Sequence, residues 1–432
     1  MTRSPVGMRL GIAGGGVAGL ALAWLLETDH DVVLLEKRDR LGGNTDTRSL
    51  QHGGRAFCVD LGVREVPDDR RSLWHRISRL TGFLPERSPV PASRTVFRDP
   101  RGTSVWSFAG KHGGAARYGP QVLPARDVLE RLVEQCALLE AQNSGWNRTL
   151  GALLAERGLS GTPAAQAVCA LPASVHGCTL DEALSLSARS VGPLLSELGP
   201  EDGRPAYTSL VAGGAGGLSQ ALAGDLRTAS IRLGVALRRL VPLDRGPGLV
   251  GSDETVHPVD AVALALPAES AKHAVGALPG AERVHAALAR VPYRDLLYGL
   301  HTDPFGMPAD RRAWSVSNVA LHAPWAETTT WLGPALGPDL FVSQLTRRRS
   351  MPRLPLMTSR FRTRLPTPAA HRAVDRLAAA QGEGHLFFAG HCATHDDSQE
   401  SALASAVAVA EQLAPDSPRL RRLRETRKEA TR

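Results

Sequence analysis

Three glycines near the N-terminus have the spacing of a phosphate-binding turn. Gly14, Gly16 and Gly19 form a GxGxxG pattern. Residues 8–13 before them fit a buried strand, and the apolar residues 17–26 after them fit one helix. In such a turn the first glycine allows a tight connection, the second lets a diphosphate approach the backbone, and the third lets helix and strand pack closely. The helix N-terminus would offer free N–H groups to the phosphates.

The next apolar run ends in a carboxylate. Residues 31–36 (DVVLLE) fit a second buried strand, and Glu36 lies about twenty residues beyond the first glycine, where an acid accepts hydrogen bonds from the ribose hydroxyls of an adenosine. Strand, glycines, helix, strand and acid in this order predict a dinucleotide-binding site. A signal peptide starting near Arg3 or Arg9 is the less favoured interpretation, because the run is rich in glycine and leads straight into a strand.

The residues after Glu36 narrow the choice of dinucleotide. Residues 37–44 are KRDRLGGN, and residues 59–62 are VDLG. This E-x-x-x-R-x-G-G pattern with VDLG resembles the FAD-binding domain of the flavin amine oxidase, phytoene desaturase and protoporphyrinogen oxidase superfamily. Within it, the chain is most similar to bacterial proteins described as predicted FAD-binding amine oxidase-like. The resemblance implies that the cofactor is FAD and that it is bound by Lys37, Arg40, Gly42, Gly43 and Asn44.

Two later segments are similar to the other cofactor-binding parts of the superfamily. Residues 208–226 have a glycine-rich turn before a helix, and no Gly-Lys-Ser/Thr follows that would make a P-loop. Residues 235–241 would then form the strand over the adenine, with Val241 as a contact. Residues 259–267 (VDAVALALP) resemble the buried strand that comes next in the superfamily.

The closing segment, residues 385–413, resembles the last cofactor-binding element. It has a strand (LFFA), then Gly390, and an apolar helix from about Ser398. By resemblance, Gly390 approaches the phosphates and ribityl chain, and the helix N-terminus points at the flavin pyrimidine ring, where its dipole would stabilise developing negative charge. Glu400 and Ser401 would take the positions of the family's Glu-Gly pair.

This segment departs from the family pattern. His391 and Cys392 replace the acid after the Ala-Gly turn, and Ser401 and Ala406 replace glycines of the helix. None of the four lysines occupies a convincing strand position near the flavin ring, which speaks against amine oxidation of the classical kind; they are Lys37, Lys111, Lys272 and Lys428.

The polar residues after Gly390 allow more than one chemistry. His391, Cys392 and residues 395–397 are of types that ligate zinc or iron. The resemblance places them beside the diphosphate instead, so we predict no metal site. Covalent attachment of the flavin through Cys392 or His391 stays open. We expect His395 and Asp396 to line the approach to the flavin, which makes them the candidates for catalysis.

The predicted fold class is α/β, with a Rossmann-like FAD-binding domain (GR2-type) built from discontinuous segments and a second α+β substrate domain. The FAD-binding domain would take residues 1–82, 205–275 and 375–418, and the substrate domain residues 83–204 and 276–374. A helical block is expected at about 120–200, with a capping box at Thr179 and Glu182. Strands between 280 and 370 would form a sheet facing the flavin, near Trp314, Trp325 and Trp331, although any one of these is more commonly a core residue.

Composition bears on the number of domains and on the cellular compartment of the protein. The chain has 432 residues, of which 43% are hydrophobic, and five scattered cysteines without a CxxC pair. These numbers fit two domains in a reducing compartment, so we expect a cytoplasmic protein. The net charge of +8 includes +5 from residues 419–432, a basic tail that we expect to be a solvated or frayed helix rather than a nucleic-acid arm.

The predicted function is that of an FAD-dependent oxidoreductase, an oxidase, dehydrogenase or desaturase. It would take hydride from an amine or alicyclic substrate to flavin N5 and pass electrons to O2 or an electron carrier. The alternatives are a flavin-dependent isomerase or mutase without net redox change, and an inactive flavin-binding homologue. We expect a small-molecule substrate, no nucleic acid, no membrane association, and a monomer or homodimer. No GxSxG, SxxK or HExxH motif supports a hydrolase.

Overall fold

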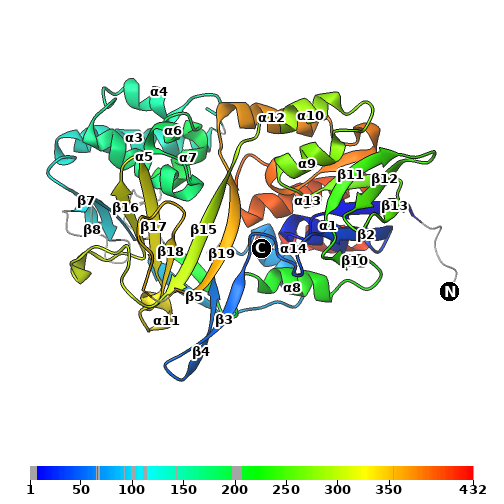
Figure 1. Cartoon of the computed structure of the whole chain (residues 1–432), viewed down its shortest axis with the longest axis horizontal. Helices are drawn as coiled ribbons and strands as arrows, with labels where there is room; N and C mark the ends of the chain where they lie inside the picture. Colours follow the sequence, from blue (N-terminus) through cyan, green and yellow to red (C-terminus); the bar gives the residue numbers. More distant parts are fainter. Residues whose placement is uncertain are drawn as a thin grey trace.

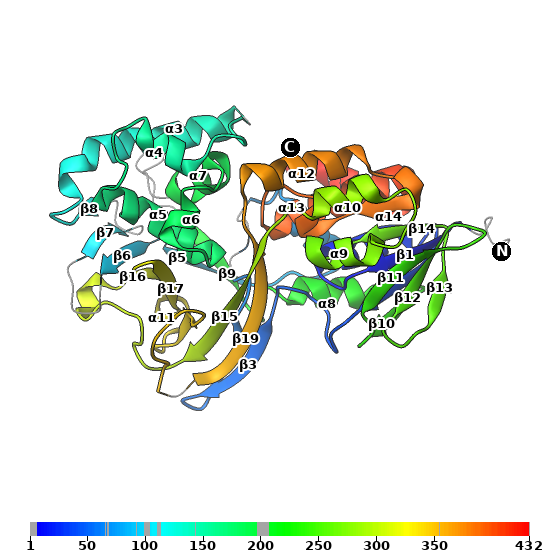
Figure 2. The same cartoon turned by 45° about the horizontal axis from the view of Figure 1, so that its top comes forward.

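The computed structural model describes residues 7–431 except 65, 67–68, 92, 99–103, 110–113, 143, 197–206 and 354. The protein has a mixed α/β structure in which a five-stranded parallel sheet and an eight-stranded sheet lie towards opposite ends of the molecule (Figure 1). Helices α3 to α7 gather over the second sheet, and a separate set of helices surrounds the first (Figures 1 and 2).

The parallel sheet draws its strands from three distant parts of the chain. Its order is β10-β2-β1-β14-β20. Because helices cover both faces, its strands are continuous apolar runs rather than alternating ones. The strands are β1 (Arg9–Ala13), β2 (Asp31–Glu36), β10 (Ser230–Leu233), β14 (Ala261–Leu264) and β20 (Leu386–Phe388).

Alternate residues of these strands face two different hydrophobic cores. One core lies under α1 (Val17–Leu26), α8 (Gly217–Gly224) and α13 (Gln399–Leu413). Helix α1 is buried along residues 18–26, which matches its apolar composition on all sides. The opposite core lies under α9 (Ala268–Val275), α10 (Glu282–Leu288), α12 (Pro368–Ala379) and an antiparallel sheet of β11 (Leu237–Pro242), β12 (Pro247–Gly251) and β13 (Val256–Pro258).

The eight-stranded sheet has the order β19-β15-β18-β17-β16-β6-β7-β8 and is antiparallel except for the pair β6 and β16. Its strands are β6 (Arg94–Arg98), β7 (Ser104–Ala109), β8 (Gly114–Tyr118), β15 (Tyr293–His301), β16 (Ser317–His322), β17 (Trp325–Trp331), β18 (Phe341–Gln344) and β19 (Pro355–Arg364).

A helical layer covers this sheet and shares one core with it. It follows the capping signals in the sequence, since Thr149 caps α4 and Thr179 with Glu182 forms the predicted capping box of α6. The helices are α3 (Arg126–Ala141), α4 (Leu150–Ala155), α5 (Pro163–His176), α6 (Leu180–Ala183) and α7 (Ala188–Ser196).

Smaller elements connect the two sheets. A hairpin of β3 (Thr47–His52) and β4 (Arg55–Asp60) projects from the molecule (Figure 1). The remaining elements are α2 (Leu73–Leu80), α11 (Gly333–Leu336), α14 (Pro418–Thr431), the paired strands β5 (Arg87–Pro91) and β9 (Tyr207–Val211), and the short 3-10 turns η1 (Leu123–Ala125), η2 (Arg311–Ala313), η3 (Glu383–His385) and η4 (Gly390–Cys392).

One predicted strand begins later than expected. We expected residues 235–241 to form the strand over the adenine, but the antiparallel strand β11 begins only at Leu237, after the parallel strand β10 has ended at Leu233. Gly234 between them has a φ of +72°, a conformation that favours glycine and turns the chain out of the parallel sheet.

The basic C-terminal segment forms a docked helix, which corrects the expectation of a solvated or frayed one. Leu420 and Leu423 of α14 are buried against the core beneath α1. Arg419 Nη1 lies 2.8 Å from Glu27 Oε1, and its guanidinium stacks 4.9 Å from the Trp24 ring. One positive charge of the basic segment is therefore paired with a buried carboxylate of the protein itself.

Within the described residues, no helix combines the length and apolar character needed to cross a membrane.

Replacing Arg419 tests this docking. In Arg419→Met, Glu27 keeps its backbone donors but loses its buried charged partner, so we expect the free energy of unfolding to fall by about 1–3 kcal/mol. Urea unfolding followed by circular dichroism measures the change. Arg422→Met, at an exposed position of the same helix, should stay close to wild type, and equal stability of the two variants would contradict the docking role.

Candidate functional site

The first and third glycines of the turn are required by the protein's own packing. Gly14 has a φ of +106° and donates its N–H to Leu35 O at 2.8 Å. A Cβ at Gly14 would lie 2.3 Å from Ala265 O, and a Cβ at Gly19 would lie 1.9 Å from Gly14 O. These contacts let α1 start directly above the carboxyl ends of the parallel strands.

The second glycine has a different environment. Gly16 is the N-cap of α1 at φ −75°, and a Cβ there would have Gly43 Cα, 3.8 Å away, as its nearest neighbour. No side chain caps this helix terminus, and its first turn has no acidic residue. The protein therefore leaves both space and uncapped backbone N–H groups at the N-terminus of α1, as an anion-binding turn requires.

A buried carboxylate closes one side of this space. Glu36 is 7% exposed; its Oε2 accepts from Gly15 N at 2.6 Å and its Oε1 from Arg38 N at 2.9 Å. Each oxygen has a further lone pair, so the carboxylate can still accept from a ligand hydroxyl. Val235 N donates to Glu36 O at 2.9 Å, which brings the turn after β10 alongside this acid.

The loop with the second glycine pair folds over the turn. Gly42 N donates to Gly15 O at 2.8 Å, and a Cβ on Gly43 would lie 3.0 Å from Gly16 Cα. Two arginines fix the loop from within, since Arg38 Nη1 donates to Gly43 O at 2.7 Å and Arg40 Nη1 donates to Thr45 O at 2.9 Å. Arg40 also lies 3.6 Å from the buried Asp46.

The closing segment reaches the same place. Gly390 follows β20 with a φ of +73°, and a Cβ on it would lie 3.3 Å from Ala18 Cβ in the first turn of α1. Its N–H donates to Ser405 Oγ at 2.8 Å. The structure thus brings residues 14–19, 36, 42–43 and 390 to the carboxyl edge of one sheet.

A buried arginine shapes the chain after Gly390. Arg364 is 1% exposed and donates to the carbonyls of His391 at 3.1 Å, His395 at 2.6 Å and Thr394. His391 Nε2 lies 2.7 Å from Asp397 Oδ1. Partial removal from water would raise the pKa of Asp397, but His391 and Arg364 lower it more, so this carboxylate is charged.

The thiol in this segment is inert. Burial raises the pKa of Cys392 to about 12, and its Sγ lies 3.6 Å from Ala389 O. A thiol with such a pKa is protonated at neutral pH and is therefore not a nucleophile there. All five cysteines are free, and within the described residues no group of three or more His, Cys, Asp or Glu side chains is placed to hold a metal ion.

Five predicted contacts lie elsewhere or have other partners. Val241 belongs to β11 and pairs with Gly248, and Lys37 is exposed beside Glu36. Both oxygens of Glu400 accept from the first residues of α2, Leu73 N at 2.6 Å and Trp74 N at 2.9 Å. Ser401 donates its N–H to Ser398 Oγ as part of the N-terminal cap of α13, and Asn44 Nδ2 donates to Arg362 O.

The two catalytic candidates have separate surroundings. Asp396 has an exposed side chain. The His395 ring stacks on Trp146 at 4.6 Å, and its Nδ1 lies 2.9 Å from His371 Nδ1. His371 Nε2 is 2.6 Å from Ser190 Oγ in α7, so the cluster joins α12 to the helical layer.

The histidines of this cluster are held neutral. Burial, Arg364 and the neighbouring His395 lower the pKa of His371 to about 3. Burial also lowers the pKa of His395, although Asp375, 3.2 Å from its Nε2, acts in the opposite direction. With neutral rings, one histidine donates and the other accepts across the Nδ1–Nδ1 contact.

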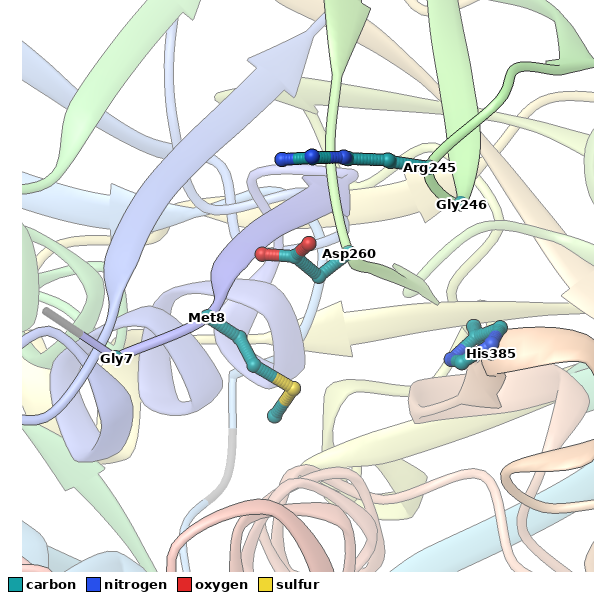
Figure 3. Close-up of a pocket in the computed structure, with 6 residues that line it drawn as sticks. All are labelled: Gly7, Met8, Arg245, Gly246, Asp260 and His385. Carbon is teal, nitrogen blue, oxygen red and sulfur yellow. The ribbon is translucent and has the colours of Figure 1, made fainter.

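Figure 3 shows a pocket at the edge of the parallel sheet opposite to the glycine turn. Met8 precedes β1, Asp260 precedes β14 and His385 precedes β20, so the pocket opens at the amino ends of the strands. Ligands of open α/β sheets bind at the carboxyl ends. We assign it no function; its lining residues are Gly7, Met8, Arg245, Gly246, Asp260 and His385.

A second cavity, of about 200 Å³, lies between the helical layer and the eight-stranded sheet. It touches α5, α7, β15, β16 and β17, and Arg64 enters it from the segment after β4. The tryptophans expected near the flavin do not line it: Trp314 packs on Trp331 at 5.4 Å, and Trp325 lies under Arg347 at 4.5 Å.

Some residues of the site carried no signal in the sequence. Arg364 and Arg64 belong to no motif, and Val235 was placed at the start of a strand although it sits in the turn beside Glu36. The VDLG segment pointed to Asp60 without showing its role. Asp60 accepts from Ala215 N at 2.9 Å and so holds the second glycine-rich turn against the β3–β4 hairpin.

The residues present fit a bound FAD. The space beside Gly16 is what a diphosphate needs, because a Cβ there would occupy it while meeting no protein atom closer than 3.8 Å. The uncapped N–H groups of α1 supply donors, and Glu36 at the end of β2 supplies an acceptor for a ribose.

The two glycines give a matched stability test. Gly14→Ala places a Cβ 2.3 Å from Ala265 O at a φ of +106°, so we expect it to lower the free energy of unfolding by about 2–4 kcal/mol. Gly16→Ala has room and an ordinary φ, so its stability without cofactor should stay within about 1 kcal/mol of wild type. Urea unfolding of the cofactor-free proteins measures both, and equal losses would refute this assignment.

The neutral His371 predicts a pH effect. Its folded pKa of about 3 lies below the unfolded value, so its contribution to stability is complete above about pH 6.5 and is lost as the pH falls towards 3. When the pH is lowered from 7 to 5, the free energy of unfolding of His371→Gln should fall by about 1–2 kcal/mol less than that of the wild type. Urea unfolding at the two pH values measures the change. His52→Gln, on the β3–β4 hairpin, is the control, and its free energy of unfolding should fall as much as that of the wild type. An equally large fall in His371→Gln would disprove the burial effect.

Almost the whole chain superposes on solved structures of two oxidases. A putrescine oxidase bound to putrescine superposes with a TM-score of 0.69 at 15% identity, over 95% of this chain and 99% of the other. Cyclohexylamine oxidase from Brevibacterium oxydans gives a TM-score of 0.67 at 17% identity, over 94% and 99%. At such identities these likenesses establish the fold.

Sequence comparison finds shorter matches. A flavin-dependent L-tryptophan oxidase from Lentzea aerocolonigenes is 36% identical over 92 residues, 21% of this chain and 19% of that protein. An L-amino acid oxidase from Cerastes cerastes is 28% identical over 141 residues, 29% and 26% of the two chains. The alignments thus span about a fifth to a quarter of the relatives' length.

A family model described as flavin containing amine oxidoreductase matches residues 17–298, well over half of the chain. The match includes α1, β2 and the glycine loop after Glu36, which confirms the resemblance drawn from these residues. The cofactor of this family is FAD. The chain belongs to the flavin containing amine oxidoreductases.

Proposed function

We propose that this protein is an FAD-dependent oxidoreductase that oxidises a small organic substrate, an amine or an alicyclic compound. The observation that carries the proposal is the uncapped N-terminus of α1 with its unfilled space at Gly16, beside a carboxylate at the end of β2. The relatives named as oxidases of amino acids and amines support the same reaction class.

The proposal assigns the cofactor to a Rossmann-like domain. It comprises residues 1–82, 205–275 and 375–418, which contribute the parallel sheet, and residues 83–204 and 276–374 form the substrate domain. Gly16 and the N–H groups of α1 would bind the diphosphate, and Glu36 would accept from the ribose. Val235 is the better candidate for the adenine side, because its N–H is bonded to Glu36 O and Val241 lies further along β11.

The flavin would supply the redox chemistry by accepting a hydride from a substrate carbon. The protein's part is to position that carbon and to exclude water. The N-terminus of α13 would favour negative charge on the side of the cofactor that it faces. The proposal assigns no step to a lysine. Lys37 is exposed, Lys272 lies in α9, Lys428 lies in α14, and Lys111 is outside the described residues.

Electrons taken from the substrate must leave again. Oxygen or an electron carrier would reoxidise the cofactor, and an oxidase fits the names of the relatives best. A flavin isomerase would return the electrons to its product instead, so the two classes differ in a measurable way.

The purified protein should be yellow, with one FAD per chain by absorbance after denaturation. Gly16→Ala should remain as stable as the cofactor-free wild type and lose most of its FAD, because the new methyl group fills the space of the diphosphate. Glu254→Ala, at an exposed residue with a φ of +60°, controls for loss of cofactor during purification and should retain the wild-type FAD content. A colourless wild type, or a fully loaded Gly16→Ala, would refute the site.

Anaerobic mixing with amines and amino acids then separates the reaction classes. An oxidoreductase should bleach the flavin bands with an equivalent of oxidised product, and admitted O2 or a dye acceptor should restore them. Product formed without lasting bleaching would favour an isomerase. Flavin that no compound reduces would favour an inactive homologue.

A further inference from the structure

The cavity between the helical layer and the eight-stranded sheet has two different walls. Helices α5 and α7, with the residue before β16, give it an apolar wall of Leu171, Val175, Leu194 and Val316. The sheet contributes hydroxyl groups, and none of the described residues that line the cavity is acidic. Its volume of about 200 Å³ equals that of about seven water molecules, so it has room for one end of a small molecule.

Three polar residues of neighbouring strands lie side by side in the sheet wall. Ser317 of β16 pairs with Thr330 of β17 in antiparallel register and with Arg94 of β6 in parallel register. Residues paired in this way project from the same face of a sheet, and all three line the cavity. We call Arg94, Ser317 and Thr330 the polar row.

The two hydroxyl groups of the polar row have no partner in the described part of the protein. Neither Ser317 Oγ nor Thr330 Oγ1 forms a hydrogen bond with any residue that the structure describes, although Thr330 is only 7% exposed. By contrast, Thr328 on the same strand donates from Oγ1 to Ser174 Oγ at 3.0 Å. A buried hydroxyl without a partner costs free energy, which a hydrogen bond to a bound molecule would recover.

The polar row lies at the end of the cavity away from the cofactor segments. Tyr298 of β15 lines the other end, and β15 pairs with β19, whose Thr363 donates from Oγ1 to Asp397 Oδ2 at 3.1 Å. In the order of the sheet, β17 lies two strands from β15 and β6 lies four strands from it. At a strand spacing of about 4.8 Å, the polar row is about 10–19 Å from β15.

We infer that the substrate carries a polar group with an acceptor oxygen at the end remote from the bond that is oxidised, and that Ser317 and Thr330 bind this oxygen. The inference rests on the proposed FAD-dependent function and adds the substrate class to it. Each hydroxyl can donate one hydrogen bond to the oxygen, and Arg94 brings a positive charge to the same end.

Two other kinds of substrate fit this end of the cavity less well. A hydrocarbon end would leave both hydroxyls unpaired, which costs binding free energy. A second amino group would find no carboxylate among the described lining residues. The apolar wall would contact the methylene groups that separate the acceptor oxygen from the reacting carbon.

The test uses the purified FAD-loaded protein and pairs of probes that differ only at the far end. L-Glutamine is compared with L-homoleucine, and 5-aminopentanamide with 5-methylhexylamine, so that an isopropyl group replaces the carboxamide in each pair. Under anaerobic conditions, the shift or bleaching of the visible flavin bands with probe concentration gives an apparent dissociation constant. In at least one pair, we expect the wild type to bind the carboxamide about 3- to 10-fold more tightly.

Variants at the polar row make the result specific. Thr330→Val keeps the shape of the side chain without its hydroxyl, so the preference for the carboxamide should fall about 3- to 10-fold, and Ser317→Ala should act in the same direction. Thr330→Ser keeps a hydroxyl and should retain the preference. Thr358→Val, the same replacement at an exposed position of β19 outside the cavity, should bind all probes as the wild type does.

The failures are distinguishable. Protein that takes up no FAD would overturn the proposed function and this inference with it. FAD-loaded protein that responds to none of the probes, shows no preference for a carboxamide, or keeps its preference in both Thr330→Val and Ser317→Ala would overturn the inference alone. If Thr330→Val does not fold, the wild-type preference and Ser317→Ala, which removes a single oxygen atom, still decide it.

Discussion

The close approach of α1 to β1 is the constraint on which the rest of the parallel-sheet side depends. Gly14 turns the chain at a φ of +106°, and Gly19 leaves the space that Gly14 O occupies. This geometry places the helix terminus above the carboxyl ends of the strands. Gly15 can then donate to Glu36, and the loop with Gly42 can close over the turn.

The sequence predicts this part well because its signals are local. Each glycine, the strand before it and the acid after it lie within about thirty residues, the length of a single supersecondary unit. The helix caps at Thr149 and Thr179 are local in the same sense, and both form as expected. The family comparison and the parallel sheet agree with these expectations.

Other residues depend on partners that only the fold brings together. Glu400 looks like a cofactor contact in the sequence, yet its carboxylate caps α2, and Val241 lies beyond a turn that Gly234 introduces. The docking of α14 depends on Glu27, far away in the chain. Arg364 belongs to no motif in the sequence. Its role is to donate to three backbone carbonyls of a segment that only the fold brings beside it.

The order of the strands has a consequence for synthesis on the ribosome. β20 and α13 are the last parts of the parallel-sheet unit to be made, but they pair with β14 and cover α1, which are made much earlier. Until residue 413 has left the exit tunnel, the apolar surface of α1 has no cover from α13. Such long-range pairing slows folding and leaves apolar surface exposed while the chain is being made.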